Sequence, residues 1–334
     1  MLMKRRQFCH AVGMTAVHAI TTPVFSAIRP AFEPAYLAAH RSGEMKKRGE
    51  TLWKRMDGCN LCPRECGARR LDGEAGFCGA SSDLIIASHH PHFGEERPLV
   101  RSGGSGTIFF SHCALRCVFC INWDTSHHGA GRKTSIEMLS RMMLDLQKRG
   151  CHNINVVTPT HYAPHILLAL DSAAGKGLNL PLVYNTCGWE NMDVLTLLDG
   201  IVDIYLPDFK YAESEMAAEY SSGASAYPEI TKAAFLEMHR QVGIARPERA
   251  VPMRRGLMIR HLVMPNHVEN SKAVISWIAE NLPPDTYLNI MSQYRPVFMA
   301  DRYPAINRRV MREEYAAVVE HAVGLGLTNL DIQG

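Results

Sequence analysis

The chain has 334 residues, of which 46% are hydrophobic, enough for one large α/β barrel or for two smaller domains. Basic residues number 36 and acidic residues 33, and three of the basic residues lie together at positions 4–6. This near-even balance excludes a strongly basic nucleic-acid-binding surface, and no run of about 18 apolar residues predicts a membrane span.

The first 27 residues have the layout of a signal segment. Residues 4–8, Lys-Arg-Arg-Gln-Phe, precede a weakly apolar stretch. The order Arg-Arg-x-Phe is typical of twin-arginine signals, which export proteins already folded around cofactors. The alternative is an uncleaved segment or a wrongly assigned start of translation, because residues 24–26, Val-Phe-Ser, make a mediocre cleavage site.

Residues 28–100 form an N-terminal extension with a four-cysteine segment, residues 59–78, which contains Cys59, Cys62, Cys66 and Cys78. Four thiolates can close the coordination shell of zinc or hold an auxiliary iron–sulfur cluster, and the spacing does not separate the two. Four free thiols are the alternative. Because seven of the ten cysteines fall into two metal-type groups, we predict metal sites in preference to a disulfide framework.

Three histidines, His89, His90 and His92, follow the four-cysteine segment. Neighbouring residues on an extended strand point to opposite faces, so these imidazoles converge poorly on a metal. We expect residues 89–96 to support the cysteine loop that follows, and not to bind a ligand.

Residues 113–120, Cys-Ala-Leu-Arg-Cys-Val-Phe-Cys, form a three-cysteine loop after an apolar run. Three cysteines can hold an iron–sulfur cluster and leave one iron open, as a catalytic metal requires. Zinc sites usually combine two cysteine doublets, and no second doublet follows Cys120 closely. The spacing therefore favours an iron–sulfur cluster on Cys113, Cys117 and Cys120 over zinc or a redox cysteine pair.

From residue 107 onward, short β runs alternate with amphipathic helices, which predicts βα units and a parallel sheet. The expected strands are residues 107–111, 154–157, 182–184, 202–206, 257–263 and 287–291. The expected helices are residues 134–150, 162–173, 192–198, 230–242, 271–280 and 312–323, the first of them starting with a capping box from Thr134 to Glu137. Six strands predict a partial (β/α)6 barrel, open on one side, over residues 101–334.

The C-x3-C-x2-C motif, with Phe119 before its last cysteine, resembles the signature of the radical S-adenosylmethionine (SAM) superfamily. From about Cys59 to the C-terminus the chain is similar to the branch of pyruvate formate-lyase activating enzyme, in particular to poorly characterised members with an N-terminal four-cysteine segment. The resemblance implies a radical SAM barrel in which the three cysteines hold a [4Fe–4S] cluster. The open iron takes the amino and carboxylate groups of SAM, and one electron cleaves SAM to a 5′-deoxyadenosyl radical.

The resemblance also implies which residues bind SAM, at the carboxyl ends of successive strands. Residues 158–161, Thr-Pro-Thr-His, stand where relatives carry Gly-Gly-Glu-Pro, so a hydroxyl and an imidazole replace a carboxylate. Residues 208–210, Asp-Phe-Lys, match a motif whose lysine reaches the SAM carboxylate. The complete predicted set is Thr158, Thr160, His161, Asn185, Thr186, Asp208, Lys210, Arg260 and Gln293.

The leading functional hypothesis is a radical SAM oxidoreductase that generates a glycyl or other substrate radical on a protein or a small molecule, and a glycyl radical enzyme is the candidate protein substrate. Its partners would be that protein substrate and a flavodoxin- or ferredoxin-type reductant. A non-catalytic iron–sulfur protein or a zinc-binding protein is the alternative. Because SAM and its reductants are cytoplasmic, we expect a cytoplasmic location, with the periplasm as the alternative if the signal segment acts.

Overall fold

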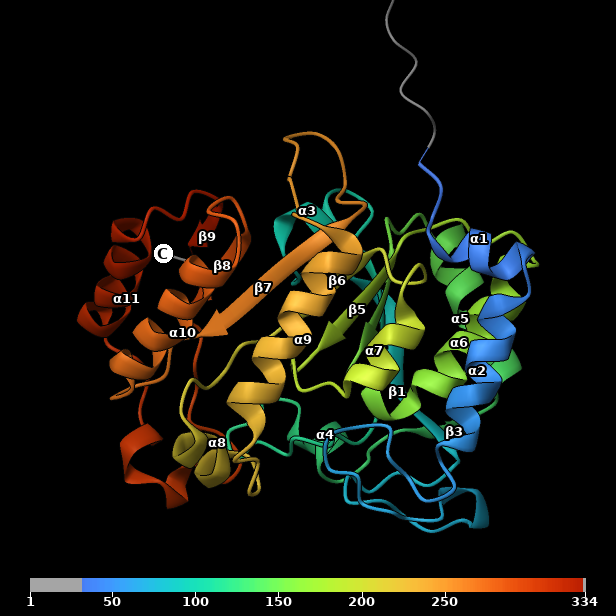
Figure 1. Ribbon diagram of the computed structural model, residues 1–334, viewed down its shortest axis with the longest axis horizontal. Coiled ribbons are helices and arrows are strands. Elements are labelled where there is room, and N and C mark those ends of the chain that lie inside the picture. Colours follow the sequence, from blue (N-terminus) through green and yellow to red (C-terminus); the bar gives the residue numbers. More distant parts are fainter. Residues whose placement is uncertain (1–31, 333–334) are drawn as a thin grey trace, which may run out of the picture. The chain divides into compact units, whose positions relative to one another are not determined.

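Nine strands of the computed structural model, which describes residues 32–332, pair in one mixed sheet (Figure 1). The strand order is β3-β1-β2-β4-β5-β6-β7-β8-β9. The strands are β1 (Leu84–His92), β2 (Ser105–Phe110), β3 (Arg132–Thr134), β4 (Ile154–Val157), β5 (Leu182–Thr186), β6 (Ile204–Pro207), β7 (Gly256–Leu262), β8 (Tyr287–Met291) and β9 (Leu330–Ile332).

The strands from β2 to β9 along this order pair in parallel, and β1 is antiparallel to both β2 and β3. The six predicted strands correspond to β2, β4, β5, β6, β7 and β8. The prediction of a mixed α/β fold with a parallel sheet is therefore confirmed. Strands β1, β3 and β9 were not predicted.

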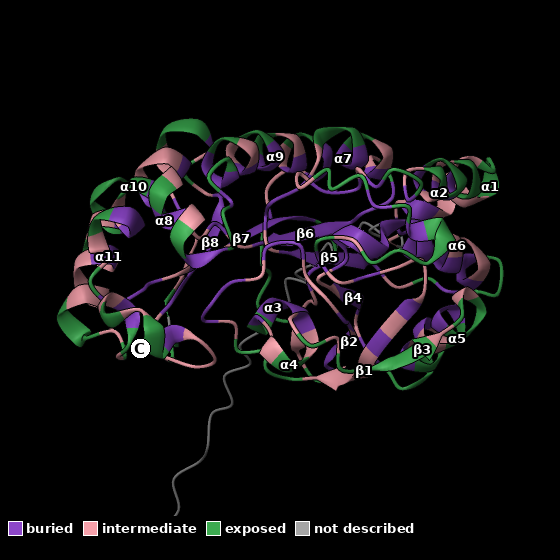
Figure 2. Cartoon of the chain, turned by 90° about the horizontal axis from the view of Figure 1, so that it is seen from below, coloured by how far each residue is buried: buried purple, intermediate pink, exposed green. Residues whose placement is uncertain are grey.

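The main helices lie along the outer side of the sheet, where Figure 2 shows them in an arc around the buried strands. The α-helices are α1 (Tyr36–Arg41), α2 (Glu44–Lys54), α3 (Arg97–Val100), α4 (Trp123–Ser126), α5 (Ile136–Lys148), α6 (Ala163–Ala174), α7 (Met192–Leu198), α8 (Ser214–Tyr220), α9 (Tyr227–Val242), α10 (Val268–Asn281) and α11 (Arg312–Gly324). Short 3-10 helices are η1 (Arg70–Asp72), η2 (Thr160–Tyr162), η3 (Ala300–Arg302) and η4 (Pro304–Ile306).

The start of α5 corrects one prediction. Its N-cap is Ser135, whose hydroxyl accepts a hydrogen bond from the Met138 amide at 3.1 Å. Thr134, the predicted cap, is instead the last residue of β3. The predicted end of this helix agrees better with the structure. The helix ends at Lys148, and Gly150 follows it with a φ of 83°, a conformation that favours glycine.

The inner face of the sheet changes character along the strands. Near the amino ends it is apolar, and a core cluster there contains Leu99 of α3 with Val183, Ile204, Leu206, Met258 and Tyr287. Two residues further along three of these strands come Asn185, Arg260 and Asn289, which share the same face because the side-chain period of a strand is two. An apolar layer therefore closes the amino end, and a polar layer lies above it.

From residue 33 onward, the N-terminal extension belongs to the same compact unit as the sheet. Strand β1 pairs with β2, so that His92 lies opposite Ser105, and α2 packs against α6. The boundary between residues 100 and 101 stays a prediction, and the predicted signal segment, residues 1–27, lies outside the described residues. Within residues 32–332, no helix has the length and apolar character needed to cross a membrane.

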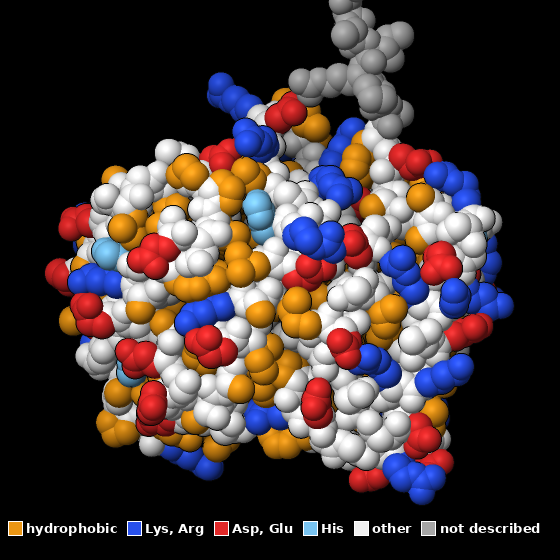
Figure 3. Space-filling view, viewed as in Figure 1, with side chains coloured by type: hydrophobic (Ala, Val, Ile, Leu, Met, Phe, Trp, Pro, Cys, Tyr) orange, Lys and Arg blue, Asp and Glu red, His pale blue; other side chains and the backbone are white. Residues whose placement is uncertain are grey.

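The surface carries both signs of charge. On the face shown in Figure 3, lysine and arginine side chains alternate with aspartate and glutamate, and apolar side chains occur between them. This mixture agrees with the near-even charge balance of the sequence.

Candidate active site

A cavity of about 440 Å³ lies at the carboxyl ends of the parallel strands. Val157, Thr186, Leu262 and Met291, each the last residue of its strand, line this cavity. The loop after β2 adds all three cysteines of the C-x3-C-x2-C motif to the wall. Parallel α/β sheets bind ligands at this end, so the cavity is the candidate active site.

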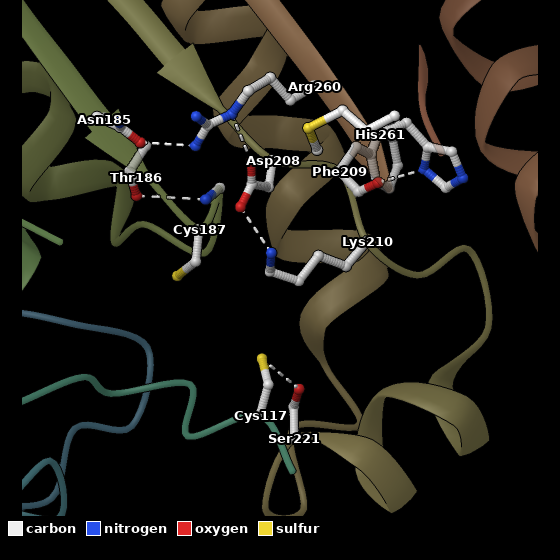
Figure 4. Close-up of polar contacts among 12 residues, drawn as sticks. Cys117, Asn185, Thr186, Cys187, Asp208, Phe209, Lys210, Ser221, Arg260 and His261 are labelled. Carbon is white, nitrogen blue, oxygen red and sulfur yellow. Dashed lines mark hydrogen bonds and ion pairs between the residues drawn. The ribbon is translucent and has the colours of Figure 1, made fainter. Parts of the chain in front are cut away.

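Hydroxyl groups contact two of the three motif sulfurs. Ser221, which follows α8, donates to Cys117 Sγ at 3.1 Å, and Ser126 of α4 donates to Cys120 Sγ at 3.1 Å (Figure 4 shows the first pair). Hydrogen bonds to ligand sulfurs are one means by which a protein sets the potential of an iron–sulfur cluster.

The thiols of the three-cysteine loop differ in acidity. The pKa of Cys113 is lowered to about 6 because the Cys187 thiol donates a hydrogen bond to its sulfur, against the opposing effect of burial. Burial raises the pKa of Cys117 to about 12. Because a metal deprotonates a coordinating thiol outright, neither value prevents ligation.

Within residues 32–332, no group of three or more His, Cys, Asp or Glu side chains is arranged to hold a single metal ion. In a cubane cluster each cysteine binds a different iron, so the ligands do not converge on one point. The donor set of Cys113, Cys117 and Cys120, three soft sulfurs facing one cavity, therefore fits an iron–sulfur cluster better than a lone zinc ion.

Two cations share one carboxylate on the opposite wall of the cavity. Lys210 Nζ donates to Asp208 Oδ2 at 2.6 Å, and Arg260 Nε donates to Asp208 Oδ1 at 2.7 Å (Figure 4). Arg260 Nη2 also donates to Asn185 Oδ1 at 2.7 Å. Burial alone would raise the pKa of Asp208, but the charges of Arg260 and Lys210 hold it below its ordinary value.

The turn that carries Asp208 packs directly against the turn after β5. The Tyr227 hydroxyl lies 2.9 Å from the Cys187 carbonyl oxygen and 2.8 Å from that of Asp208. Gly188 has a φ of 81°, and a Cβ at this position would collide with the Asp208 carbonyl oxygen. Glycine is therefore required where the two turns meet.

The four cysteines of the N-terminal extension lie near one another, although their side chains, all within the described residues, are not arranged to hold a single metal ion. The pKa of Cys62 is raised to about 12, chiefly by burial and in part by the nearby thiols of Cys78, Cys59 and Cys66. Arg70 is fully buried beside them, and its Nη1 lies 3.7 Å from Cys59 Sγ. A buried guanidinium needs negative charge close by, which metal-bound thiolates would supply. The second metal site stays a prediction.

The four-cysteine segment also holds the candidate site in place. Arg64 donates from Nε to the Ala114 carbonyl at 3.1 Å and from Nη2 to the Ser221 carbonyl at 2.9 Å. Arg70 Nη1 donates to the His161 carbonyl at 2.9 Å. The segment thus fixes the three-cysteine loop and the turn after β4 through backbone carbonyls.

Comparison with known proteins finds a relative in Methanocaldococcus jannaschii. The chain is 33% identical over 273 residues to the uncharacterized protein MJ0674 of Methanocaldococcus jannaschii, an alignment that covers 79% of this chain and 74% of MJ0674. The chain belongs to the MJ0674 family. No protein-family model matches it.

Two solved structures of SuiB from Streptococcus suis are similar to this MJ0674-family chain. The crystal structure of SuiB bound to S-adenosylmethionine has a TM-score of 0.46 and 12% sequence identity, covering 66% of this chain and 48% of SuiB. A second SuiB crystal structure has a TM-score of 0.46 and 12% identity, covering 67% of this chain and 47% of SuiB. The chain spans about half the length of SuiB.

Seven of the nine predicted SAM-binding residues line the cavity of this MJ0674-family protein: Thr158, Asn185, Thr186, Asp208, Lys210, Arg260 and Gln293. Thr160 and His161 do not line it, because η2 turns them behind the wall. The His161 ring is buried and donates to the Ser111 carbonyl at 2.8 Å, and burial lowers its pKa to about 3. His161 therefore supports the start of the three-cysteine loop as a neutral imidazole.

Glu190 is a buried carboxylate behind the cavity that the sequence did not reveal. It accepts hydrogen bonds from Thr160 at 2.7 Å, from Thr186, and from Tyr184 at 3.4 Å. Burial raises its pKa to about 7. Glu190 thereby joins the ends of β4 and β5. In the sequence Glu190 resembles an ordinary polar residue before a helix, and no local signal indicates this role.

Glu95 and Glu96 were also missed, and their position corrects the expectation for residues 89–96. Because β1 is antiparallel to β2, the end of β1 lies at the amino end of β2, away from the three-cysteine loop. Glu95 and Glu96 instead line the cavity together with Asn289. The stretch therefore contributes to the pocket and does not support the cysteine loop.

Proposed function

We propose that this protein is a radical SAM enzyme that cleaves SAM reductively at a [4Fe–4S] cluster held by Cys113, Cys117 and Cys120. One electron from a reductant breaks the C5′–S bond of SAM and leaves methionine and a 5′-deoxyadenosyl radical. The six parallel strands from β2 to β8 would then form the partial (β/α)6 barrel that surrounds this chemistry.

The observation that carries the proposal is a shared cavity. The three cysteines of the C-x3-C-x2-C motif line the same cavity as the Asp208, Lys210 and Arg260 network. An electron carrier would bury a fully ligated cluster and would have no use for a charged wall facing three sulfurs. A ligand that contacts both the cluster and charged side chains accounts for both features.

The charged network is suited to the amino-acid part of SAM. Lys210 Nζ can donate three hydrogen bonds, of which Asp208 accepts one. The Lys210 side chain is 15% exposed and borders the cavity. Its remaining donors fit the SAM carboxylate, while Asp208 keeps Lys210 charged and oriented. Asn185 and Thr186 add polar groups on the neighbouring strand end.

The finer assignment rests on the sequence motifs of residues 185–188 and 208–210, which resemble those of pyruvate formate-lyase activating enzyme. We propose on this basis that a glycyl radical enzyme is the protein substrate and that a flavodoxin- or ferredoxin-type protein is the reductant. Both partners are cytoplasmic, in keeping with the expected location. The four-cysteine segment would hold zinc or an auxiliary iron–sulfur cluster.

The proposal is tested by SAM turnover. The full chain is reconstituted anaerobically with iron and sulfide, reduced with dithionite, and assayed for 5′-deoxyadenosine. The wild-type protein should form 5′-deoxyadenosine, and Cys117→Ala should form none. Cys151→Ala is the matched control, because Cys151 is a buried thiol outside both cysteine groups, and it should keep the activity.

Two results would contradict the proposal. Iron and sulfide bound without 5′-deoxyadenosine formation would favour the non-catalytic iron–sulfur alternative. Zinc bound at the three-cysteine loop, with no iron retained after reconstitution, would favour the zinc-binding alternative.

A further inference from the structure

Three largely buried polar side chains, Glu95, Glu96 and Asn289, line one part of the cavity wall, and we call them the cavity floor. Asn289 stands one layer above the apolar cluster that contains Tyr287. The two glutamates reach the same level from the turn between β1 and α3. Their side chains are 9% and 4% exposed, so this is an interior site and not a solvated acidic surface.

The cavity floor presents hydrogen-bond acceptors that lack donors. Asn289 Nδ2 donates to Glu96 Oε1 at 3.1 Å, and Arg260 Nη1 lies 3.5 Å from Glu95 Oε2 and 3.9 Å from Glu96 Oε1. Three buried oxygens nevertheless accept no hydrogen bond from residues 32–332: Glu95 Oε2, Glu96 Oε2 and Asn289 Oδ1. Buried acceptors are almost always satisfied by protein, water or ligand, so these three oxygens require donors that the described residues do not supply.

The charges on the wall favour a positive donor at the two glutamates. The acidic side chains of the cavity are Glu95, Glu96 and Asp208, and its two largely buried cations are Arg260 and Lys210, whereas the third basic residue, Arg295, is exposed to solvent. Both cations direct their shortest hydrogen bonds to Asp208. The negative charge of the two glutamates is therefore only partly compensated by neighbouring cations. Uncompensated charge in a buried site lowers the stability of the folded protein.

We propose that the cavity floor binds a cationic N–H group, a primary ammonium or a guanidinium, of the substrate on which the enzyme acts. Such a group supplies both the missing positive charge and several donors, which a hydroxyl or an amide does not. The identification of this cation with the substrate rests on the function proposed above. SAM would occupy the end of the cavity nearer the three-cysteine loop, and the substrate cation the floor.

When no cation is bound, burial and the neighbouring Glu96 favour the protonated form of Glu95. Burial, the largest effect, raises the pKa of Glu95 to about 8, and the neighbouring Glu96 raises it too, although Arg260 opposes both. A protonated Glu95 relieves the repulsion between two buried carboxyl groups. When a cation binds, it provides the compensation in place of this proton, which leaves to solvent.

The test uses small probes on the full reconstituted chain. Binding of n-butylamine and n-butylguanidine is measured by calorimetry or ligand-observed NMR, with n-butanol and butyrate as neutral and anionic probes of matched size. The two cations should bind at least about tenfold more tightly than butanol, since hydrogen bonds to charged groups are the stronger ones. They should also bind when SAM is present at saturation. Nα-acetyl-lysine methylamide then distinguishes a cation presented on a peptide from a free small molecule.

Variants locate the binding. Glu96→Gln should lower cation affinity at least about tenfold, and Glu95→Gln provides a second test if the first variant folds poorly. Glu280→Gln is the matched control, because Glu280 is an exposed glutamate on α10, and it should bind cations as the wild type does. Equal affinity for butylamine and butanol would overturn the proposal, as would cation binding that neither floor variant weakens.

The outcomes separate this proposal from the proposed function. A wild-type protein that cleaves SAM but does not prefer the cations refutes the role of the cavity floor alone. A protein that binds the cations but forms no 5′-deoxyadenosine refutes the proposed function alone. Cation binding that saturating SAM abolishes would assign the floor to SAM itself and would overturn its assignment to a substrate.

Discussion

Replacement of Asp208 by asparagine should destabilise the folded protein by about 3 kcal/mol at neutral pH. Asp208 accepts charge-assisted hydrogen bonds from Lys210 at 2.6 Å and from Arg260 at 2.7 Å. Each such bond is worth about 1.5–3 kcal/mol, and loss of one partner of a buried ion pair costs about 3–5 kcal/mol. The three side chains are 15–17% exposed. Because they are partly solvated, we expect the loss of unfolding free energy to lie at the lower end of the range for a buried ion pair, about 3 kcal/mol.

The measurement is the free energy of unfolding from chemical denaturation of Asp208→Asn, Lys210→Met and the double variant. The double-mutant cycle should give a coupling of about 1.5–3 kcal/mol between the two positions. Glu229→Gln is the matched control, because Glu229 pairs with Lys232 at 2.8 Å but is 77% exposed. That change should cost less than about 1 kcal/mol.

The pH dependence gives a second check on the same reasoning. The neighbouring cations hold the pKa of Asp208 below its ordinary value, so its contribution to stability is complete above that value and is lost as the pH falls. The difference between wild type and Asp208→Asn should therefore be constant above about pH 5 and shrink below about pH 4. A coupling below about 0.5 kcal/mol, or a difference that grows on acidification, would refute the argument.

Three further predictions concern other parts of the molecule. Cys62→Ala should lower both the melting temperature and the metal content. In small modules a structural metal contributes on the order of 10 kcal/mol to the free energy of folding. An unchanged melting temperature and metal content would exclude the second metal site. Lys210→Ala should weaken SAM binding by about ten- to a hundredfold in equilibrium dialysis, and an unchanged Kd would contradict its role. Glu314→Gln should lower the free energy of unfolding by about 1–3 kcal/mol at pH 7. Hydrogen bonds from Arg308, and then from the Met311 amide, lower the pKa of Glu314 to about 2. This cost should disappear as the pH falls from about 4.5 towards 2, and a cost independent of pH would contradict the assignment.

The parallel part of the sheet could be predicted because its strands are short, apolar and buried on both faces. Strand β1 could not, because its sequence Leu-Ile-Ile-Ala-Ser-His-His-Pro-His combines polar residues with a proline, and most of it is only half-buried. Strands β3 and β9 have three residues each, too few for a periodic pattern. The missing β1 mattered most, because its direction determines where Glu95 and Glu96 lie.

The candidate site was predictable where residues adjacent in sequence act together. The short spacing of Cys113, Cys117 and Cys120 predicted that they act together, and all three line one cavity. Asp208 lies two residues from its partner Lys210. Residues whose partners are distant in the chain escaped prediction. Glu96, for example, meets Asn289 across 193 positions, and nothing in the local sequence of either residue indicates this contact.

Such long separations have a consequence for the order in which the protein forms. Arg64 reaches the Ser221 carbonyl across 157 positions, and the pairing of Asn289 with Glu96 closes a still longer loop. Loops of this length lose much chain entropy on closing, so these contacts should form after the local βα units have folded. During synthesis the four-cysteine segment emerges first but docks late. We therefore expect an interval in which the three-cysteine loop is already formed and still uncovered, and in which the proposed cluster would be delivered to it from outside.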